Sequence, residues 1–490
     1  MTKIIGAVNS VVWGMPALIL IVGVGMFLSI RTGFVQITLF PKALKKFFSL
    51  LKGEKKTDGS VSSFQALCTA LAATVGTGNL VGVAGAICIG GPGAIFWMWV
   101  CGMLGMVTKY AEVVLAVRYR VKDGAGWAGG PMYIISQGMG SRWRWLAWIY
   151  SFFGVFAAFG VGNATQINAV ITGINGVLTR FGGTASGKTD LMMGLALAVF
   201  VGMMLSGGAK RIGAAAERLV PFASCGYLLL CVGVLIFRLD AIPSAFRMIV
   251  FGAFHPRAVT GGMLGSAFRA LRVGCARGVF TNEAGMGTAS IAHAGAEVAH
   301  PVQQGLMGIV EVFLDTIVIC TMTALAILCS GVTIPYGVDA GANLTTGAFT
   351  AVYGDWVSIV IAGALSCFAI ATILGWGLYG ARCAQFLLGG RGWKCFVVMQ
   401  SAAVVIGAVL NTELVWSLSE TVNGLMAIPN LIVLAYLSPE LKRLTLEYKE
   451  KSGACTASGG NYADFHQRKP LRALSHAEIP PSGCGSQKAG

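Results

Sequence analysis

Charged side chains are scarce in this sequence. Lys, Arg, Asp and Glu make up 11% of the 490 residues, whereas 55% of the residues are hydrophobic and the mean hydropathy is +0.73. Soluble domains carry about 25% charged residues. Because so few charges cannot cover a folded chain toward water, we expect lipid to be its solvent and the fold to be that of an all-α polytopic membrane protein.

Acidic residues are the scarcer charged kind: 20 Asp and Glu stand against 36 Lys and Arg, and the net charge is +16. A strongly basic chain can bind nucleic acid. Here the basic residues gather between hydrophobic stretches rather than along one face, which is typical of membrane topology. We therefore expect membrane lipid, and no nucleic acid, as a partner.

Patterns that hold a metal or build an active site are also missing. The 13 cysteines form no C-x-x-C pair and no Cys/His cluster at zinc spacing, and most of them lie in apolar stretches. Neither a nucleophile–base pair nor the polar stripe of a channel is apparent. We expect no transition-metal site, no organic cofactor and no enzymatic activity.

Gly, Pro and charged residues divide the chain into eleven apolar segments, which predict about eleven transmembrane helices. The segments cover approximately 11–30, 63–90, 93–118, 146–175, 190–207, 217–237, 259–292, 304–330, 354–380, 394–411 and 414–437. We interpret 1–61 as an extra N-terminal helix with a basic cytoplasmic loop, 62–292 and 304–440 as two five-helix repeats, and 452–490 as a disordered cytoplasmic tail.

The loops alternate in their content of Lys and Arg. The loop after the first segment holds Lys42, Lys45 and Lys46 among others, whereas the loop after the fourth holds only Arg180 and Lys188. Basic loops stay in the cytoplasm. The alternation predicts a cell inner-membrane protein with its N-terminus outside and its C-terminus in the cytoplasm.

Two segments are interrupted near their middle, at 74–79 (TVGTGN) and 280–288 (FTNEAGMGT). An unwound turn exposes half-helix N-termini, which attract a carboxylate, and carbonyl oxygens, which coordinate a cation. If the first segment is an extra helix, the breaks fall in helices one and six of a ten-helix core made of two inverted repeats. The structural alternative for each break is a close-packing glycine motif.

Several longer stretches resemble the alanine/glycine:cation symporter family, which has the LeuT-type fold. They lie within about 10–440: 63–72 (SFQALCTALA), 75–83 (VGTGNLVGV), 90–100 (GGPGAIFWMWV), 129–133 (GGPMY), 162–166 (GNATQ), 277–288 (RGVFTNEAGMGT) and 372–376 (TILGW). The resemblance implies a secondary symporter that imports alanine or glycine with sodium, or less often with protons. The chain departs from the family at Ala371, usually Ser or Thr, and at Ala381, usually Glu, and the first change leaves the coupling ion open.

The breaks and the resemblance together predict a binding site. The predicted substrate residues are Gly76, Thr77, Gly78, Asn79, Gln166, Asn282, Gly285, Thr372 and Trp376, and the predicted sodium residues are Ala73, Gly76 and Thr372. The amide of Gln166 can accept from an ammonium and donate to a carboxylate. Trp376, one helical turn after Thr372, would close a pocket around a small side chain. The alternatives are an interhelical hydrogen bond for Gln166 and an interface anchor for Trp376.

Carboxylates also occur at membrane depth. Glu311 and Asp315, four residues apart, could relay protons, hold a cation, or pair with Arg272 or Arg277. Glu283, at the second break, is expected to cap freed backbone donors. We assign no ligand role to the histidines at 293 and 300.

The sequence leaves three functions open. A sodium-coupled importer of alanine or glycine is the leading hypothesis. The alternatives are a proton-coupled amino-acid symporter and a transporter-like amino-acid sensor. Oligomeric state, enantiomer preference and stoichiometry are not predicted.

Overall fold

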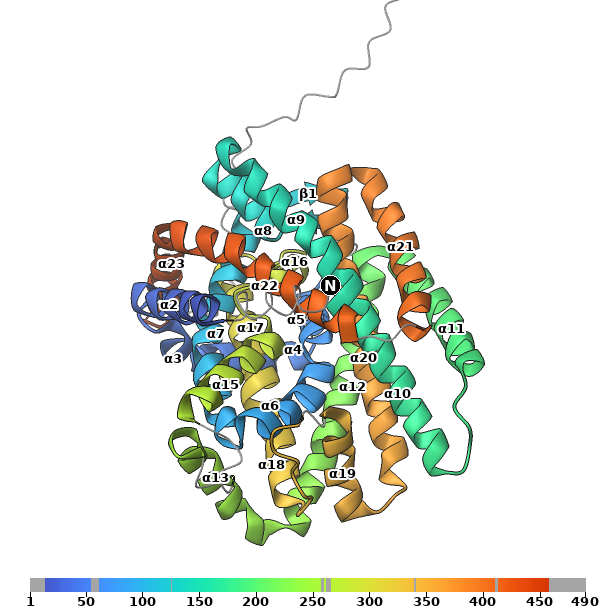
Figure 1. Ribbon diagram of the computed structural model, residues 1–490. Helices are drawn as coiled ribbons and strands as arrows, with labels where there is room; N and C mark the ends of the chain where they lie inside the picture. Colours follow the sequence, from blue (N-terminus) through green and yellow to red (C-terminus); the bar gives the residue numbers. More distant parts are fainter. Residues whose placement is uncertain are drawn as a thin grey trace, which may run out of the picture. The chain divides into compact units, whose positions relative to one another are not determined.

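The computed structural model describes residues 14–53, 61–124, 126–256, 260, 266–338, 341–409 and 413–457 (Figure 1). Nearly all of them are helical. The strands in these ranges are β1 (Val121–Asp123) and β2 (Gly126–Ala128), which form one antiparallel hairpin with Lys122 opposite Trp127. The predicted all-α polytopic class is confirmed.

The first half of the chain forms long helices joined by short π and 3₁₀ turns. Its elements are α2 (Met15–Thr32), α3 (Val35–Thr38), α4 (Phe40–Leu51), α5 (Ser63–Thr74), η1 (Gly78–Gly82), α6 (Val83–Gly90), α7 (Gly93–Arg118), α8 (Pro131–Tyr133), η2 (Ile134–Met139), η3 (Ser141–Trp143), α9 (Arg144–Phe159), η4 (Gly160–Ala164), α10 (Thr165–Arg180), α11 (Gly187–Ser206) and α12 (Gly208–Phe237).

The second half continues in the same way. Its elements are η5 (Leu239–Ala241), α13 (Ile242–Phe254), α15 (Ala267–Asn282), α16 (Thr288–His293), α17 (Pro301–Val312), η6 (Phe313–Cys320), α18 (Thr321–Cys329), α19 (Gly341–Tyr353), α20 (Val357–Leu388), α21 (Gly390–Val409), α22 (Glu413–Tyr436) and α23 (Ser438–Ala457). Short helices α13 and α19 lie between the predicted segments and were not expected from the sequence.

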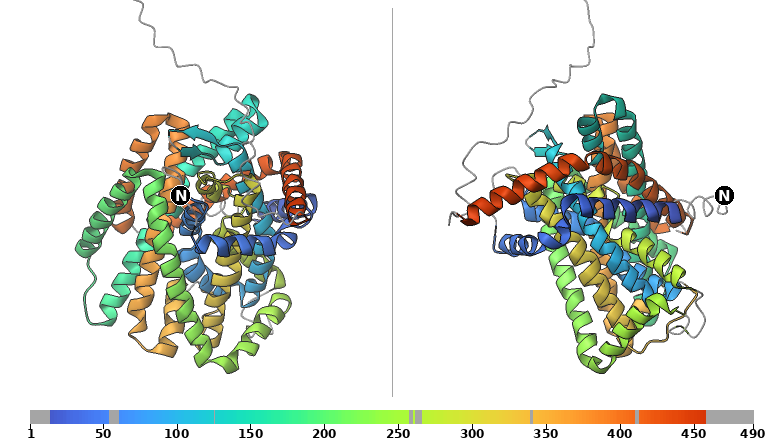
Figure 2. Two further views of the ribbon diagram at one scale, coloured as in Figure 1. Left: turned by 180° about the vertical axis from the view of Figure 1, so that it is seen from behind. Right: turned by 90° about the vertical axis from the view of Figure 1, so that its left-hand side faces the viewer.

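Each of the eleven predicted segments contains helix, although 11–13, 259, 261–265 and 410–412 lie outside the described residues. By length and apolar composition, seven helices in the described part can cross a membrane, or up to nine if each of two bent pairs is one span. The first segment is counted only as a short apolar helix, and the right-hand view of Figure 2 shows α2 running crosswise to α12. Its membrane crossing stays a prediction.

The predicted domain boundaries need two adjustments. If each repeat has five helices, α15 is the first helix of the second repeat. We therefore propose that the boundary lies between α13 and α15 instead of at 292. The inverted repeats stay a prediction. α23 continues to Ala457, six residues into the tail predicted to be disordered from 452, and 458–490 lie outside the described residues.

Contacts divide the chain into one large unit, Met1–Leu446, and a small one, Glu447–Gly490. The described part of the small unit is the end of α23, where Lys451 pairs with Glu447 one turn before it at 2.6 Å. The predicted site residues all belong to the large unit.

Within the large unit, the interrupted helices lie among long continuous ones. α7 packs against α15 and α17, while α20 packs against α9, α10, α12 and α5. Figure 1 shows α10 and α12 alongside α20. α5 also packs against α12, whereas α6, after the break, packs against α15 and α7, so the first break lies between the two sets of helices.

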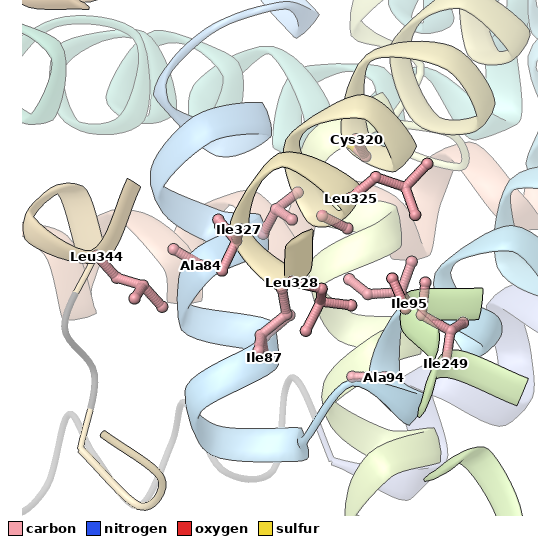
Figure 3. Close-up of a cluster of buried hydrophobic side chains, with 14 of the residues drawn as sticks. Ala84, Ile87, Ala94, Ile95, Ile249, Cys320, Leu325, Ile327, Leu328 and Leu344 are labelled. Carbon is pink, nitrogen blue, oxygen red and sulfur yellow. The ribbon is translucent and has the colours of Figure 1, made fainter. Parts of the chain in front are cut away.

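The apolar core beside the first break is formed by small and branched side chains. Ala84 and Ile87 of α6 meet Ile95 of α7 and Leu325 and Leu328 of α18, and all five are buried (Figure 3). Because such close apolar packing is rigid, it fixes the half-helix α6 that follows the first break.

Candidate functional site

The first break lies where the sequence predicted it. α5 starts with a capping box between Ser62 and Gln65 and ends at Thr74, because Val75 takes an extended conformation. The chain resumes as η1 and α6 after a bend of 50°. The side-chain oxygen of Asn79 accepts a hydrogen bond from the backbone N–H of Gly76 at 2.9 Å, which satisfies one donor that the helix no longer pairs.

Four of the predicted residues meet at this break. Thr372 of α20 donates its hydroxyl to the carbonyl of Ala72 at 3.0 Å, and Thr77 donates to the side-chain oxygen of Gln166 at 3.3 Å. A side chain at Gly76 would stand 2.7 Å from the Thr372 hydroxyl and 3.8 Å from the Gln166 oxygen. Only glycine fits between α20 and α10 here.

The predicted sodium residue Ala73 lies at the same junction. A Cβ at Gly375 of α20 would be 2.9 Å from the Cβ of Ala73, so the two helices are in backbone contact. The Thr372 hydroxyl and the Ala72 carbonyl are the oxygen atoms that this contact brings together. Carbonyl and hydroxyl oxygens are ligands for hard cations.

The second break is also present. α15 ends at Asn282, its C-cap Glu283 has a φ of +54°, and the chain passes through Gly285 (φ +96°) and Gly287 (φ +78°) before α16. The backbone N–H groups of both glycines donate to Oε1 of Glu112, at 2.8 and 3.0 Å. Asn430 bridges the same carboxylate and the carbonyl of Gly285. Glu112, a residue of α7, therefore caps the break.

Glu112 takes the role that the sequence analysis gave to Glu283. The two carboxylate oxygens of Glu283 instead accept from the indole N–H of Trp376 at 2.9 Å and from the hydroxyl of Thr288 at 2.6 Å. Glu283 does carry the left-handed turn, but its side chain points to Trp376 rather than to the backbone. The capping prediction was wrong for this residue.

Trp376 is fully buried, and its ring lies against Gly162 of η4, where no side chain would fit. Gly285 lies on another side of the break, near Leu431 of α22 and Ile21 of α2. Gly76, Gly78, Gly285 and Trp376 therefore do not line one common pocket in this structure.

Asn79 and Asn282 converge on the carboxylate of Asp315, which pairs here with neither Arg272 nor Arg277. The Asn79 amide donates to Oδ1 of Asp315 at 2.7 Å, and the hydroxyl of Thr316 donates to Oδ2 at 2.8 Å. The Asn282 amide donates to the Thr316 hydroxyl at 3.1 Å. These four buried residues link both breaks through one carboxylate of η6, which makes a second group of oxygen atoms beside the first.

Glu311 pairs with Lys109 and His293, not with Arg272 or Arg277. Its carboxylate lies 3.4 Å from the Lys109 ammonium and 2.9 Å from Nε2 of His293. Because Gln304 Nε2 lies 2.7 Å from Nδ1 of His293 and donates there, the imidazole carries its proton on Nε2 and donates to Glu311.

The network of polar contacts that runs from Lys109 through Glu311, His293 and Gln304 ends on α5. The hydroxyl of Ser63 donates to the side-chain oxygen of Gln304 at 2.5 Å. All members of the network are buried. The network therefore joins α5, which precedes the first break, and α16, which follows the second, to α7 and α17. His293 thus has a structural role, although the sequence analysis assigned it no ligand role.

A cavity of about 710 Å³ leads to the first break. Thr77 and Gly78 line it at the break, and Arg180, Asn343 and Ser358 line it near the ends of α10, α19 and α20. The other seven predicted substrate residues do not line it. The cavity thus reaches the first break from the side where α10 ends and α19 and α20 begin.

The hairpin β1–β2 ties the opposite side together. Asp123 forms an ion pair with Arg382 of α20, and Arg120 donates to the carbonyls of Ala294 and Ala296 after α16. Burial lowers the pKa of the Arg120 guanidinium to about 10, so it keeps its charge at neutral pH. The hairpin therefore connects the second broken helix to α20, and we name these contacts the latch.

Residues 182–189 (GGTASGKT) match the spacing of a phosphate-binding loop. Such a loop must follow a strand and open a helix, but this stretch follows α10. Its Ser186 and Thr189 cap α11 reciprocally instead. The stretch is a helix cap between two long helices. In the described ranges, no three His, Cys, Asp or Glu side chains are grouped so that they could hold a metal ion.

The sequence analysis missed Lys109, Glu112, Gln304 and Asn430. Lys109 and Glu112 lie inside the apolar segment 93–118, and an ionisable residue within a span is a functional candidate by default. The sequence signal of these two residues is the same as that of Glu311 and Asp315. The two amides gave no signal of their own, because their role depends on which helices touch.

Comparison with known proteins shows the family of this chain. The profile of the Sodium:alanine symporter family matches residues 1–458. An uncharacterised transporter of Haemophilus influenzae is 43% identical over 454 residues, 92% of this chain and 96% of that protein. The sodium/alanine symporter AgcS of Methanococcus maripaludis is 43% identical over 453 residues, 91% and 97% of the two chains.

Among solved structures, MhsT in complex with L-phenylalanine is similar over 80% of this chain and 99% of that one, with 12% identity and a TM-score of 0.49. The family match covers nearly the whole chain, and its members are transporters, which confirms that the chain is not an enzyme. The protein is a multi-pass membrane transporter and belongs to the sodium:alanine symporter family.

Proposed function

We propose that this protein is a secondary symporter that imports alanine or glycine together with sodium, with its N-terminus outside and its C-terminus in the cytoplasm. One observation carries the proposal. Where α5 is broken, the Thr372 hydroxyl donates to the Ala72 carbonyl and Thr77 donates to Gln166, and a cavity of 710 Å³ reaches the break at Thr77. The relative from Methanococcus maripaludis bears the name sodium/alanine symporter, which supports sodium and alanine.

The substrate would lie at Thr77 and Gly78, where the cavity reaches the break. The backbone N–H groups that begin η1 suit a carboxylate, and the Gln166 amide, already bonded to Thr77, suits an uncharged polar contact. The space around Gly76 is small, because a methyl group added there would already contact the Thr372 hydroxyl. These features favour a small neutral amino acid over a bulky one.

The sodium ion would lie between α5 and α20, on the Thr372 hydroxyl and the carbonyls at Ala72 and Ala73. No full charge is present among these ligands, which suits a monovalent ion that must also leave. An ion there would tie the interrupted helix to α20 and fix the break in the shape that binds substrate.

The side on which the cavity opens, taken with the predicted topology, indicates which state of the transport cycle this structure represents. The cavity opens near Arg180, at the end of α10 that the basic-loop pattern assigns to the outside. The latch closes the other side through Asp123 and Arg382. We therefore interpret this structure as the form that receives substrate from outside.

Uptake into sealed vesicles tests the proposal. Purified protein is reconstituted, and labelled alanine uptake is measured with an inward sodium gradient alone, an inward proton gradient alone, and neither. We expect accumulation with sodium only. Binding without accumulation under every gradient would indicate a sensor instead.

A second candidate is proton coupling, and one observation favours it. Asp315 is buried and is joined through Asn79 to the backbone N–H of Gly76, so a change of its charge would reach the first break through two hydrogen bonds. In that case Asp315→Asn would remove the dependence of uptake on the proton gradient. In the sodium case, the same variant would retain sodium-driven uptake or lose binding altogether.

A further inference from the structure

Helix α4 presents faces of different character. Ala43 and Leu50, two turns apart, are buried against the protein. On the flank next to them, the side chains of Phe48 and Leu51 are 57% and 52% exposed. Since 3.6 residues complete a turn, these exposed apolar side chains form one strip along the helix.

The opposite flank is basic. Lys42, Lys45 and Lys52 follow one another at intervals of three and seven residues, which places them on one side of the helix, and all three are exposed. Lys46 adds a fourth positive charge, and the segment 34–53 has no acidic residue. A helix with an apolar strip beside a row of lysines is typical of one that lies in a membrane interface.

We propose that α4 is an in-plane helix that binds anionic phospholipids. The apolar strip would enter the acyl-chain boundary, and the lysines would contact the phosphate groups, with their aliphatic stems covering the apolar surface between. A zwitterionic surface would offer the strip the same contact but would give the lysines no net charge to bind. The predicted partner is thus the anionic headgroup layer of the bilayer.

The position of α4 connects this surface to the transport machinery. α4 packs against α17, and the ring of Phe40 contacts that of Phe313 edge-on at 4.9 Å between centroids. Phe313 begins η6, the segment that carries Asp315. Lipid bound along α4 would therefore hold the helix that supports both Glu311 and Asp315, so we infer that anionic lipid raises the rate of uptake.

Direct binding tests the proposal without any need for transport. Full-length protein in a neutral detergent is titrated with short-chain phosphatidylglycerol, short-chain phosphatidylcholine, and glycerophosphoglycerol, which has the headgroup and no chains. Each surface lysine contributes roughly fivefold to the affinity for anionic lipid. Changing Lys42, Lys45 and Lys52 together to Gln should weaken phosphatidylglycerol binding on the order of 100-fold, whereas the matched triple change to Arg should leave it within about twofold.

A second measurement uses vesicles of phosphatidylcholine with increasing fractions of phosphatidylglycerol. Wild type and the Arg variant should transport faster as the anionic fraction rises, while the Gln variant should not respond, and all three should be equal in phosphatidylcholine alone. Unchanged phosphatidylglycerol binding by the Gln variant would overturn the proposal, as would equal binding of glycerophosphoglycerol. Because binding is measured without a gradient, its failure leaves the proposed symport untouched, and failure of symport leaves the binding result valid.

Discussion

Replacing Gly76 by alanine should disturb the first break through a single contact. The added Cβ would stand 2.7 Å from the Thr372 hydroxyl, closer than the 3.0 Å that real Cβ atoms essentially keep. Either the break or α20 must move, and overpacking of this kind costs about 1–3 kcal/mol. If the cost falls on the substrate-bound form, alanine binding weakens by about 5-fold to 150-fold.

A second substitution identifies the contact. In the Gly76→Ala background, Thr372→Ala removes the oxygen and should relieve the clash, whereas Thr372→Ser keeps it and should not. Alanine affinity at saturating sodium is measured for the single and double variants. Contacting residues couple by about 0.5–3 kcal/mol. If the effects of Gly76→Ala and Thr372→Ala simply multiply, Gly76 and Thr372 do not touch and the geometry of the site is refuted.

Three further substitutions probe other parts of the structure. Lys109→Met leaves the Glu311 carboxylate buried without its cation and should destabilise the protein by about 3–5 kcal/mol. The double variant Lys109→Met with Glu311→Gln should recover most of that stability in thermal denaturation. If the double variant is no more stable than Lys109→Met, the ion pair is contradicted. Asp123→Asn removes the ion pair of the latch and should weaken the apparent alanine affinity by no more than about fivefold, because the pair is half-exposed. A variant in which Asp123 and Arg382 exchange their charges should recover the wild-type affinity. Trp376→Ala empties a fully buried ring position and removes the donor to Glu283, so it should destabilise the protein by about 3–5 kcal/mol without admitting larger neutral amino acids; competition by larger amino acids in an active variant would show instead that Trp376 is a pocket wall.

Composition and glycine placement predicted the membrane class and both breaks because these signals are local. Gly76 and Gly78 interrupt an apolar segment wherever it packs, and the structure breaks α5 between Thr74 and η1. The contact of Thr372 with the first break was also anticipated, but from the family resemblance rather than from the spacing of residues.

The partners of the buried charges could not be predicted in the same way. Glu311 meets Lys109 because α7 packs against α17, and no periodicity within either helix specifies that contact. Gly285 illustrates the same limit. The sequence around Gly285 resembles that of the first break. Gly285 nevertheless has a positive φ and donates to Glu112, and it lies next to α2 and α22.

The coupling between sodium and alanine tests the central claim most directly. Alanine affinity is measured in detergent while sodium is titrated, and sodium affinity is measured while alanine is titrated, for wild type and Thr372→Ala. We expect each ligand to tighten the other by the same factor and Thr372→Ala to weaken sodium. Alanine affinity that ignores sodium but changes with pH would contradict the sodium site and assign coupling to Glu311 and Asp315.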